Sequence, residues 1–295
     1  MILTIGEILI DIFPDDSRIG GAPFNFAAHL RALGFPVIFI SRIGNDDNGD
    51  MLSDAVKKRG FDLKYIQRDD RHATGHVRVT LDEDGLPEFD IVRDVAYDHL
   101  DYTAPVAEAL LEVPRLIYYG TLVQRTAKGA ATLMKILEHR SPATRCFYDI
   151  NLRPGGYDKN AITKSLIHCD VLKLNDDELA ILRHFFDFRT PDNEFIEDLM
   201  HSFSVEWVCL TGGERGSTLF TREGLWHADA ETTGEIADTV GAGDAFAAVL
   251  AAGYLEGWKP EQIVRRAARL AGAVCGIRGA IPEEDMFYDR FSGWR

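Results

Sequence analysis

The chain has 295 residues, 46% of them hydrophobic and 27% charged, which excludes a disordered or fibrous protein. The 32 basic and 47 acidic residues give a formal net charge of −15, and such a field repels a phosphate backbone, so an extended nucleic-acid surface is excluded. No apolar run approaches the roughly 20 residues of a membrane-spanning helix. We expect a protein with a sizeable core that binds neither nucleic acid nor membrane.

The cysteines and the N-terminal residues indicate the compartment. No two cysteines form a Cys-x-x-Cys pair, and Cys146, Cys209 and Cys275 stand in apolar runs, so we expect small core residues and neither a disulfide framework nor a zinc site. The opening residues MILTIGEILIDIF lack the basic segment and the cleavage site of a signal peptide. We therefore expect a cytoplasmic protein.

Apolar and amphipathic segments alternate along the chain. We expect a strand over 2–13, a helix over 23–33 closed by Gly34, a strand over 37–43 and a helix over 48–59 closed by Gly60. Further strands are expected at 116–119, 146–150, 171–174 and 205–210, with helices at 128–140, 161–168, 176–185 and 193–203. This order predicts an α/β fold with a mostly parallel sheet and helices on both faces, in a single domain over residues 1–295.

One segment departs from this order. Residues 75–81 and 88–93 alternate apolar and polar side chains around the turn sequence DEDG at 82–85, which predicts a β-hairpin with one buried face. We interpret this inserted hairpin, within 72–95, as a lid over a ligand or a dimer surface. The alternative is a sheet-edge hairpin without a function of its own.

The strongest chemical signal is DTVGAGDAF at 238–246. Gly241, Ala242 and Gly243 precede an apolar helix, where backbone N–H groups and the helix dipole favour an anion such as a phosphoryl group. Asp244 falls in the first turn of that helix and can accept a proton from an attacking hydroxyl. The alternative for Asp244 is simple helix capping. The segment is neither a Walker A loop nor a dinucleotide-binding Gly-x-Gly-x-x-Gly motif.

DTVGAGDAF resembles the C-terminal signature of the ribokinase/PfkB carbohydrate-kinase family. Four other segments resemble family motifs and occur in the family's order along almost the whole chain: GGAPFN at 20–25, RIGNDDNG at 42–49, NDDE at 175–178 and TGGERG at 211–216. The resemblance implies a ribokinase-like three-layer α/β/α sandwich with a small β lid. It also implies an ATP-dependent carbohydrate kinase in which Asp244 is the catalytic base and Gly241, Ala242 and Gly243 hold the transferred phosphoryl group.

The resemblance further implies roles for residues on the sugar side and the nucleotide side. The sugar would be bound by Asp11, which we place at the end of the first strand, and by Gly21 and Asn25. Arg153 would bind the sugar or a phosphate, and a structural salt bridge is its alternative. ATP would be bound by Asn175, Thr211, Gly213 and Gly216. Glu178 would hold Mg²⁺ through water, and Asp238, with the loop 276–280, would bind a monovalent cation such as K⁺.

Substrate and partners follow less directly. The stretches at 20–34, 96–98 and 118–125 look most like the fructokinase-like branch, so fructose is the expected substrate. 2-Keto-3-deoxygluconate is the runner-up and would use Arg153 or Arg125, and ribose or a nucleoside comes third. The segment 11–20 is short for the family, which can alter specificity. A non-catalytic sugar- or nucleotide-binding protein is the alternative of another class, and we expect a homodimer formed through the lid.

Overall fold

The computed structural model describes residues 1–13, 16–81, 87–231, 234 and 236–294. Its main sheet has the strand order β13-β12-β11-β10-β9-β8-β1-β4-β5. The strands from β5 to β11 in this order are parallel, and β12 and β13 add an antiparallel edge. The strand bounds are β1 Ile2–Ile5, β4 Val37–Gly44, β5 Ile66–Asp69, β8 Leu116–Gly120, β9 Arg145–Asp149, β10 Val171–Asn175, β11 Trp207–Thr211, β12 Ser217–Thr221 and β13 Gly224–Ala228.

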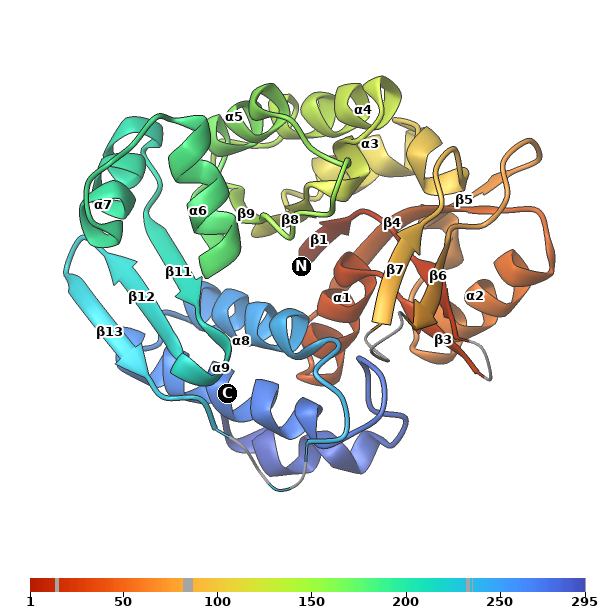
Figure 1. The fold of residues 1–295 in the computed structure, drawn as a ribbon. Helices are drawn as coiled ribbons and strands as arrows, with labels where there is room; N and C mark the ends of the chain where they lie inside the picture. Colours follow the sequence, from red (N-terminus) through yellow and green to blue (C-terminus); the bar gives the residue numbers. More distant parts are fainter. Residues whose placement is uncertain (14–15, 82–86, 232–233, 235, 295) are drawn as a thin grey trace.

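Helices cover both faces of this sheet (Figure 1). One face packs against α1 (Ala22–Ala32), α2 (Asp47–Lys58), α8 (Ala242–Glu256) and α9 (Pro260–Cys275). The other packs against α3 (Ala104–Leu111), α4 (Ala127–Glu138), α5 (Lys159–Ile167), α6 (Asp176–Phe185) and α7 (Asp192–Phe203). Short 3₁₀ turns lie at Leu63–Tyr65, Ala96–His99, Leu122–Gln124, Gly213–Arg215 and Asp285–Trp294. The expected three-layer α/β/α architecture is confirmed.

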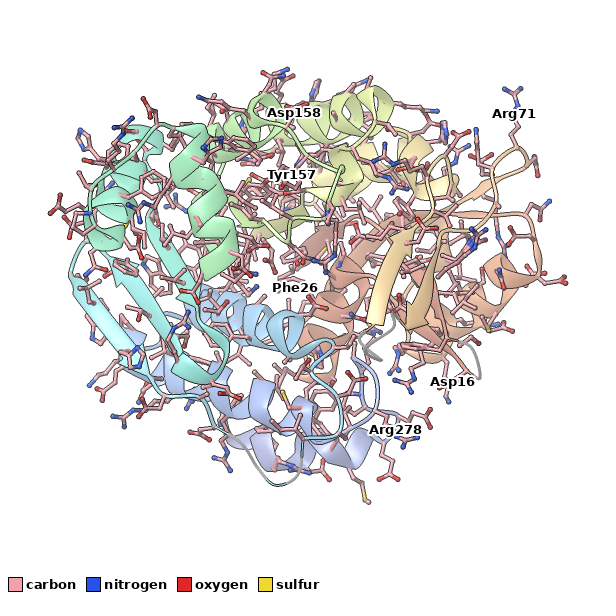
Figure 2. All side chains as sticks on the ribbon, in the orientation of Figure 1. Asp16, Phe26, Arg71, Tyr157, Asp158 and Arg278 are labelled. Atoms are coloured by element: carbon pink, nitrogen blue, oxygen red, sulfur yellow. The ribbon has the colours of Figure 1, made fainter. Side chains whose placement is uncertain are left out.

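Alternate residues of each strand serve the two cores. In β8, Tyr118 packs into the α1/α8 core, where its ring stacks on Phe26 at 3.7 Å between centroids, whereas Tyr119 packs into the α4/α5 core. Figure 2 shows Phe26 near the centre of the molecule, while side chains such as Arg71 project at its rim. This period of two is what a strand buried on both faces requires. In the part of the chain that the structure describes, no helix is long and apolar enough to cross a membrane.

The strand expected over 2–13 is wrong, because the chain divides there into two strands of different sheets. β1 ends at Ile5, Gly6 turns the chain at a φ of 151°, and β2 (Leu9–Ile12) begins a second sheet. Asp11 therefore lies on the second sheet and not at the end of the first strand. A side chain at Gly6 would overlap the ring of Pro23 in α1, so the close approach of the helix requires glycine here.

The second sheet has four strands in the order β3-β2-β6-β7 and stands beside the main sheet (Figure 1). β6 (His76–Leu81) and β7 (Pro87–Ile91) pair antiparallel, as the hairpin pattern predicts. β3 (Ser17–Gly20) pairs with β2, which itself pairs parallel with β6. The turn expected at 82–85 lies outside the described residues. The predicted hairpin is thus half of a larger sheet whose other half comes from the N-terminal segment.

Candidate active site

The carboxyl ends of the central parallel strands carry a buried ion pair. Lys173 of β10 lies in register with Asp149, the last residue of β9, and its Nζ is 3.0 and 3.3 Å from the two carboxylate oxygens. The Tyr118 hydroxyl of β8 donates to the same carboxylate at 3.2 Å. Burial alone lowers the pKa of Lys173, but the nearby Asp149 and Glu178 outweigh it and the pKa is raised. Lys173 therefore keeps its positive charge inside the protein.

This charge lies beside the N-terminus of α8. Gly241 caps the helix at a φ of 80°, so the first-turn N–H groups that follow have no helical acceptor. A Cβ placed at Gly243 would be 3.7 Å from Lys173 Nζ. The segment Gly241–Gly243 thus combines backbone donors, a helix dipole and a fixed cation, which together favour an anion. Sequence reasoning missed Lys173, although a single charged residue inside the apolar strand VLKL was a usable signal.

We expect Gly241→Ala to impair both stability and activity. The left-handed φ disfavours a side chain, and the new Cβ would lie 2.5 Å from Cα of Ala280. The strain should cost about 1–3 kcal/mol and displace the helix start. Urea unfolding and ADP release measure the two effects. Gly257→Ala is the matched control, since Gly257 has a φ of 64° with no atom within 4 Å of a new Cβ, so the control should lose stability but keep activity.

Asp244 is the third residue of α8 and hydrogen-bonds to helix α1. Nδ2 of Asn25 donates to Asp244 Oδ2 at 2.7 Å. Burial raises the pKa of Asp244 to about 7; the Asn25 hydrogen bond opposes this shift, and the Asp149 charge adds to it. The N-cap of α8 is Gly241 and no side chain caps the helix, so simple capping does not account for Asp244. A carboxyl with a pKa near neutrality beside an anion site is suited to general-base work.

Of the other residues expected on the sugar side, Gly21 lies at the start of α1 and Asp11 lies on β2. Gly21, at a φ of 107°, begins α1, and a Cβ there would be 2.5 Å from the Glu7 carbonyl oxygen. Burial raises the pKa of Asp11 to about 6 against the opposing charges of Arg153 and Arg18. Arg153 is exposed; within the described ranges it donates to the Leu152 carbonyl at 3.2 Å and forms no ion pair, so the salt-bridge alternative is not supported.

Arg153 interacts electrostatically with several carboxyl groups on the expected sugar side. Its positive charge lowers the pKa of Asp11, of Asp244 and of Glu7 against the effect of burial. One cation thus opposes the effect of burial on three carboxyl groups that belong to different parts of the chain. Asn25 contacts Asp244 directly, and the charge of Arg153 acts on both Asp11 and Asp244, while the roles of all four with a sugar stay predictions.

Glu7 is a buried carboxyl that sequence reasoning missed. It follows Gly6 between β1 and β2, is only 4% exposed, and its Oε2 has no hydrogen-bond partner among the described residues. Burial raises its pKa to about 7, partly offset by a hydrogen bond to its own backbone and by the charges of Arg153 and Arg125. The signal that could have identified Glu7 from the sequence is a single charged residue within an apolar run.

We expect Glu7→Gln to change the pH dependence of stability. A carboxyl with a raised pKa binds more protons when folded than when unfolded, so Glu7 makes the wild-type protein less stable as pH rises from about 4.5 to 7. A neutral amide removes that loss. The free energy of unfolding of the variant, relative to that of the wild type, should therefore rise by about 2–3 kcal/mol between pH 5 and pH 8. Urea unfolding of both proteins at pH 5 and pH 8 tests this. If their difference in unfolding free energy is the same at the two pH values, the pKa of Glu7 is not raised.

The residues expected to bind ATP lie at the ends of β10 and β11. Asn175 and Thr211 pair with each other as the last residues of β10 and β11. Both therefore lie at the carboxyl end of the parallel strands, where Asp149 also lies. Gly213 and Gly216 follow β11 in a turn with φ values of 58° and 82°. A Cβ at Gly216 would lie 2.9 Å from Cα of Asp229, so this turn needs glycine, whereas Gly213 is open to solvent. Their contacts with a nucleotide stay predictions.

The two expected metal ligands are already engaged. Both oxygens of Glu178 accept backbone N–H groups, from Asn175 and Leu152 at 2.8 Å each, and Asn175 Oδ1 accepts the Glu178 N–H in return. Burial raises the pKa of Glu178 against the opposing charge of Lys173. Carboxylate oxygens suit Mg²⁺, and these hydrogen bonds favour contact through water.

Asp238, the expected monovalent-cation ligand, accepts three hydrogen bonds. They come from the Val240 N–H at 3.0 Å, the Gly279 N–H at 3.1 Å and Arg18 NH1 of β3 at 3.1 Å. The guanidinium thus already supplies a cation at this carboxylate. A bound K⁺ would have to share Asp238 with Arg18, so this role stays a prediction.

Comparison with known proteins identifies the family. Residues 4–286 match the model of the "pfkB family carbohydrate kinase". The chain is 30% identical to probable fructokinase-3 of Arabidopsis thaliana, over 96% of this chain and 88% of the relative, and 27% identical to fructokinase-2 of Oryza sativa subsp. japonica, over 96% and 90%. A fructokinase from Xylella fastidiosa, solved with bound ATP, has the same fold with a TM-score of 0.84, at 22% identity over 99% of this chain and 98% of the other. The chain belongs to the pfkB family of carbohydrate kinases and is an ATP-dependent sugar kinase.

Proposed function

We propose that this sugar kinase phosphorylates fructose, with Asp244 as the base that activates the attacking hydroxyl. The observation that carries the proposal is the set of polar groups connected to the base. Asn25 donates to Asp244, and the charge of Arg153 acts on both Asp244 and Asp11, so amide, guanidinium and carboxylate groups are available to a sugar. Such groups bind several hydroxyls of one polyol. The names of the fructokinase relatives support a ketohexose over other sugars.

In the proposed mechanism, the side chains around Asp244 hold a primary hydroxyl against its carboxylate. Asp244 takes the hydroxyl proton as the oxygen attacks the γ-phosphorus of ATP in line. The first-turn N–H groups of α8 and the Lys173 ammonium stabilise the charge on the phosphoryl oxygens as the bond to ADP breaks. Asn25 fixes the rotamer of Asp244 through its 2.7 Å hydrogen bond, so the base is oriented before the sugar arrives.

We further propose that Asn175, Thr211, Gly213 and Gly216 bind the nucleotide and that Glu178 positions hydrated Mg²⁺. When bound, Mg²⁺ neutralises phosphate charge. The formal net charge of −15 makes such neutralisation favourable, because the field of an acidic protein opposes the approach of an uncompensated polyanion. Removal of divalent ions by EDTA should therefore abolish turnover.

The test is a coupled ADP-release assay with ATP, Mg²⁺ and a panel of acceptors. The panel holds fructose, ribose, glucose, 2-keto-3-deoxygluconate, fructose 6-phosphate and adenosine. The proposal expects the highest kcat/KM with fructose. A higher value with any other acceptor would reject the fructose assignment and leave the sugar-kinase activity intact.

One observation favours a second candidate, 2-keto-3-deoxygluconate. A cavity of about 140 Å³ beside strand β7 of the second sheet is lined by Arg93, Arg125 and Arg153. These cations could receive a sugar carboxylate. However, Arg125 is held bidentately by Asp98 at 2.6 and 2.7 Å. In their ionised forms, the carboxyl groups of Glu7, Asp11 and Asp244 also repel an acid. We therefore rank the neutral sugar first.

The expected homodimer stays part of the proposal. The second sheet presents Ile12 of β2 38% exposed, and a partner sheet would cover it. Light scattering after gel filtration distinguishes a dimer from a 33.0 kDa monomer.

A further inference from the structure

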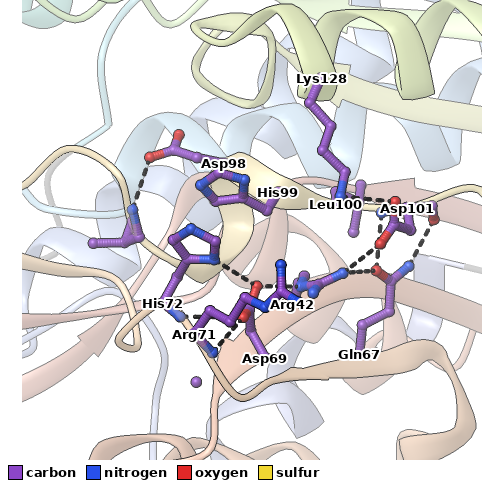
Figure 3. A network of polar contacts seen from close by, with 12 residues as sticks. Arg42, Gln67, Asp69, Arg71, His72, Asp98, His99, Leu100, Asp101 and Lys128 are labelled. Carbon is purple, nitrogen blue, oxygen red and sulfur yellow. Dashed lines mark hydrogen bonds and ion pairs between the residues drawn. The ribbon is translucent and has the colours of Figure 1, made fainter.

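Two histidines and an aspartate meet at the root of the β6–β7 hairpin, where the hairpin joins the rest of the chain. His72 precedes β6, while Asp94 and His99 follow β7. One potential ligand atom from each lies within 4.8 Å of the other two. Figure 3 shows His72 and His99 next to each other above Asp69. Both ends of the hairpin thus contribute to one cluster.

Two of the three ligand distances in this cluster bracket the value for a tetrahedral metal site. His99 Nε2 lies 2.8 Å from Asp94 Oδ1, and His72 Nε2 lies 3.8 Å from the same oxygen. Metal–ligand distances of about 2.0–2.2 Å place ligand atoms roughly 3.3 Å apart, between these two values. The imidazole rings stack at 3.5 Å with 12° between their planes, so one ring must rotate for both nitrogens to face one ion.

The exposure of the cluster permits this adjustment. The Asp94 side chain is 79% exposed, and those of His72 and His99 are each 23% exposed. An ion can therefore arrive from solvent, Asp94 can move to meet it, and water can complete the coordination. Asp94 stands at a φ of 58°, a conformation uncommon outside glycine, and this turn brings its carboxylate toward the two rings.

A supporting carboxylate orients one of the histidines. Nδ1 of His72 is 3.0 Å from Asp69 Oδ2, and Asp69 is fixed by Arg42 Nε at 2.7 Å and by the Arg71 N–H at 2.8 Å (Figure 3). The proton on Nδ1 then points to Asp69, which leaves the lone pair on Nε2, the atom that faces Asp94. A carboxylate behind a metal-binding histidine is the usual support of such ligands.

We propose that His72, Asp94 and His99 form a site for a divalent transition-metal ion of the Zn²⁺ or Co²⁺ type, which ties the two ends of the lid hairpin together. Two imidazole nitrogens with one carboxylate select such ions over Mg²⁺, which prefers oxygen ligands. The site uses none of the residues assigned to Mg²⁺ and ATP. Its occupancy would slow opening at the root of the hairpin without taking part in phosphoryl transfer.

The test is titration of the full-length protein with Zn²⁺ by calorimetry and with Co²⁺ by its visible absorption. The wild type should bind one equivalent of metal and melt at a higher temperature when loaded. His72→Gln and His99→Gln should each weaken binding by at least about tenfold. His227→Gln is the matched control, because His227 is exposed on the distant strand β13 and also lies near a carboxylate, 3.5 Å from Asp229. This variant should bind the metal like the wild type.

Two results would overturn the site. One is the absence of saturable binding to the wild type, and the other is equal affinity in the wild type and both histidine variants. Melting of the metal-free variants checks that they fold. If a histidine variant unfolds, Asp94→Asn replaces it, since its side chain is mostly exposed, and unchanged metal affinity in that variant would equally reject the proposal.

Discussion

Asp244→Asn should lower kcat by about 10²- to 10⁴-fold, the usual contribution of a general base, while leaving the fold intact. The replacement has nearly the same shape and can still accept the hydrogen bond from Asn25, so the loss should fall on kcat and not on the KM for ATP. Steady-state ADP release with a sugar and with ATP varied separately measures both. Asp177→Asn, an exposed aspartate in the first turn of α6, is the matched control and should be fully active.

The pH profile gives a second view of the same residue. Because burial raises the pKa of Asp244 to about 7, kcat/KM should rise with pH through about 7 and level off above it, as the base loses its proton. The residual rate of Asp244→Asn should lack this rise. Glu7→Gln should keep it, which separates Asp244 from the other carboxyl with a pKa of about 7. A rise that persists in Asp244→Asn would show that another group is the base.

Lys173→Met should destabilise the protein by about 3–5 kcal/mol, because it leaves the buried carboxylate of Asp149 without its cation. That is a large share of the roughly 5–15 kcal/mol by which a folded domain is stable. Urea unfolding at pH 7 measures the loss. Lys164→Met, at an exposed position of α5, should change stability by less than about 0.5 kcal/mol.

A double variant separates the structural role of Lys173 from the role in phosphoryl transfer that we propose for it. Asp149→Asn combined with Lys173→Met removes both charges, so much of the lost stability should return. Activity should not return, because the ammonium beside Gly243 is still missing. Recovery of both stability and activity would show that Lys173 serves the fold alone.

The regular parts of the fold were predictable from the sequence. The helix expected over 176–185 matches α6, and the strands β4, β8, β9, β10 and β11 differ from expectation by only one or two residues at either end, because their apolar runs have clear ends. β3, β5, β12, β13 and α3 were not predicted. These are short elements whose composition is mixed, and their pairing depends on neighbours that are distant in the sequence.

The break in the first apolar run shows why local pattern was insufficient. Both β1 and β2 are apolar, so periodicity reads them as one strand, and only the approach of Pro23 to Gly6 reveals the turn. The glycine-rich start of α8 was predictable because its residues are contiguous in the chain. Lys173 and Glu7 were not, since their significance comes from Asp149, Gly243 and Arg153, which the fold brings to them.

The ion pair between Arg18 and Asp238 determines part of how firmly the second sheet is held to the rest of the fold. It joins β3 of the second sheet to the segment before α8, with side chains 28% and 17% exposed. A partly solvated ion pair of this kind contributes about 1 kcal/mol or less. Thermal motion can therefore break this contact between the second sheet and the segment before α8 at little cost in free energy.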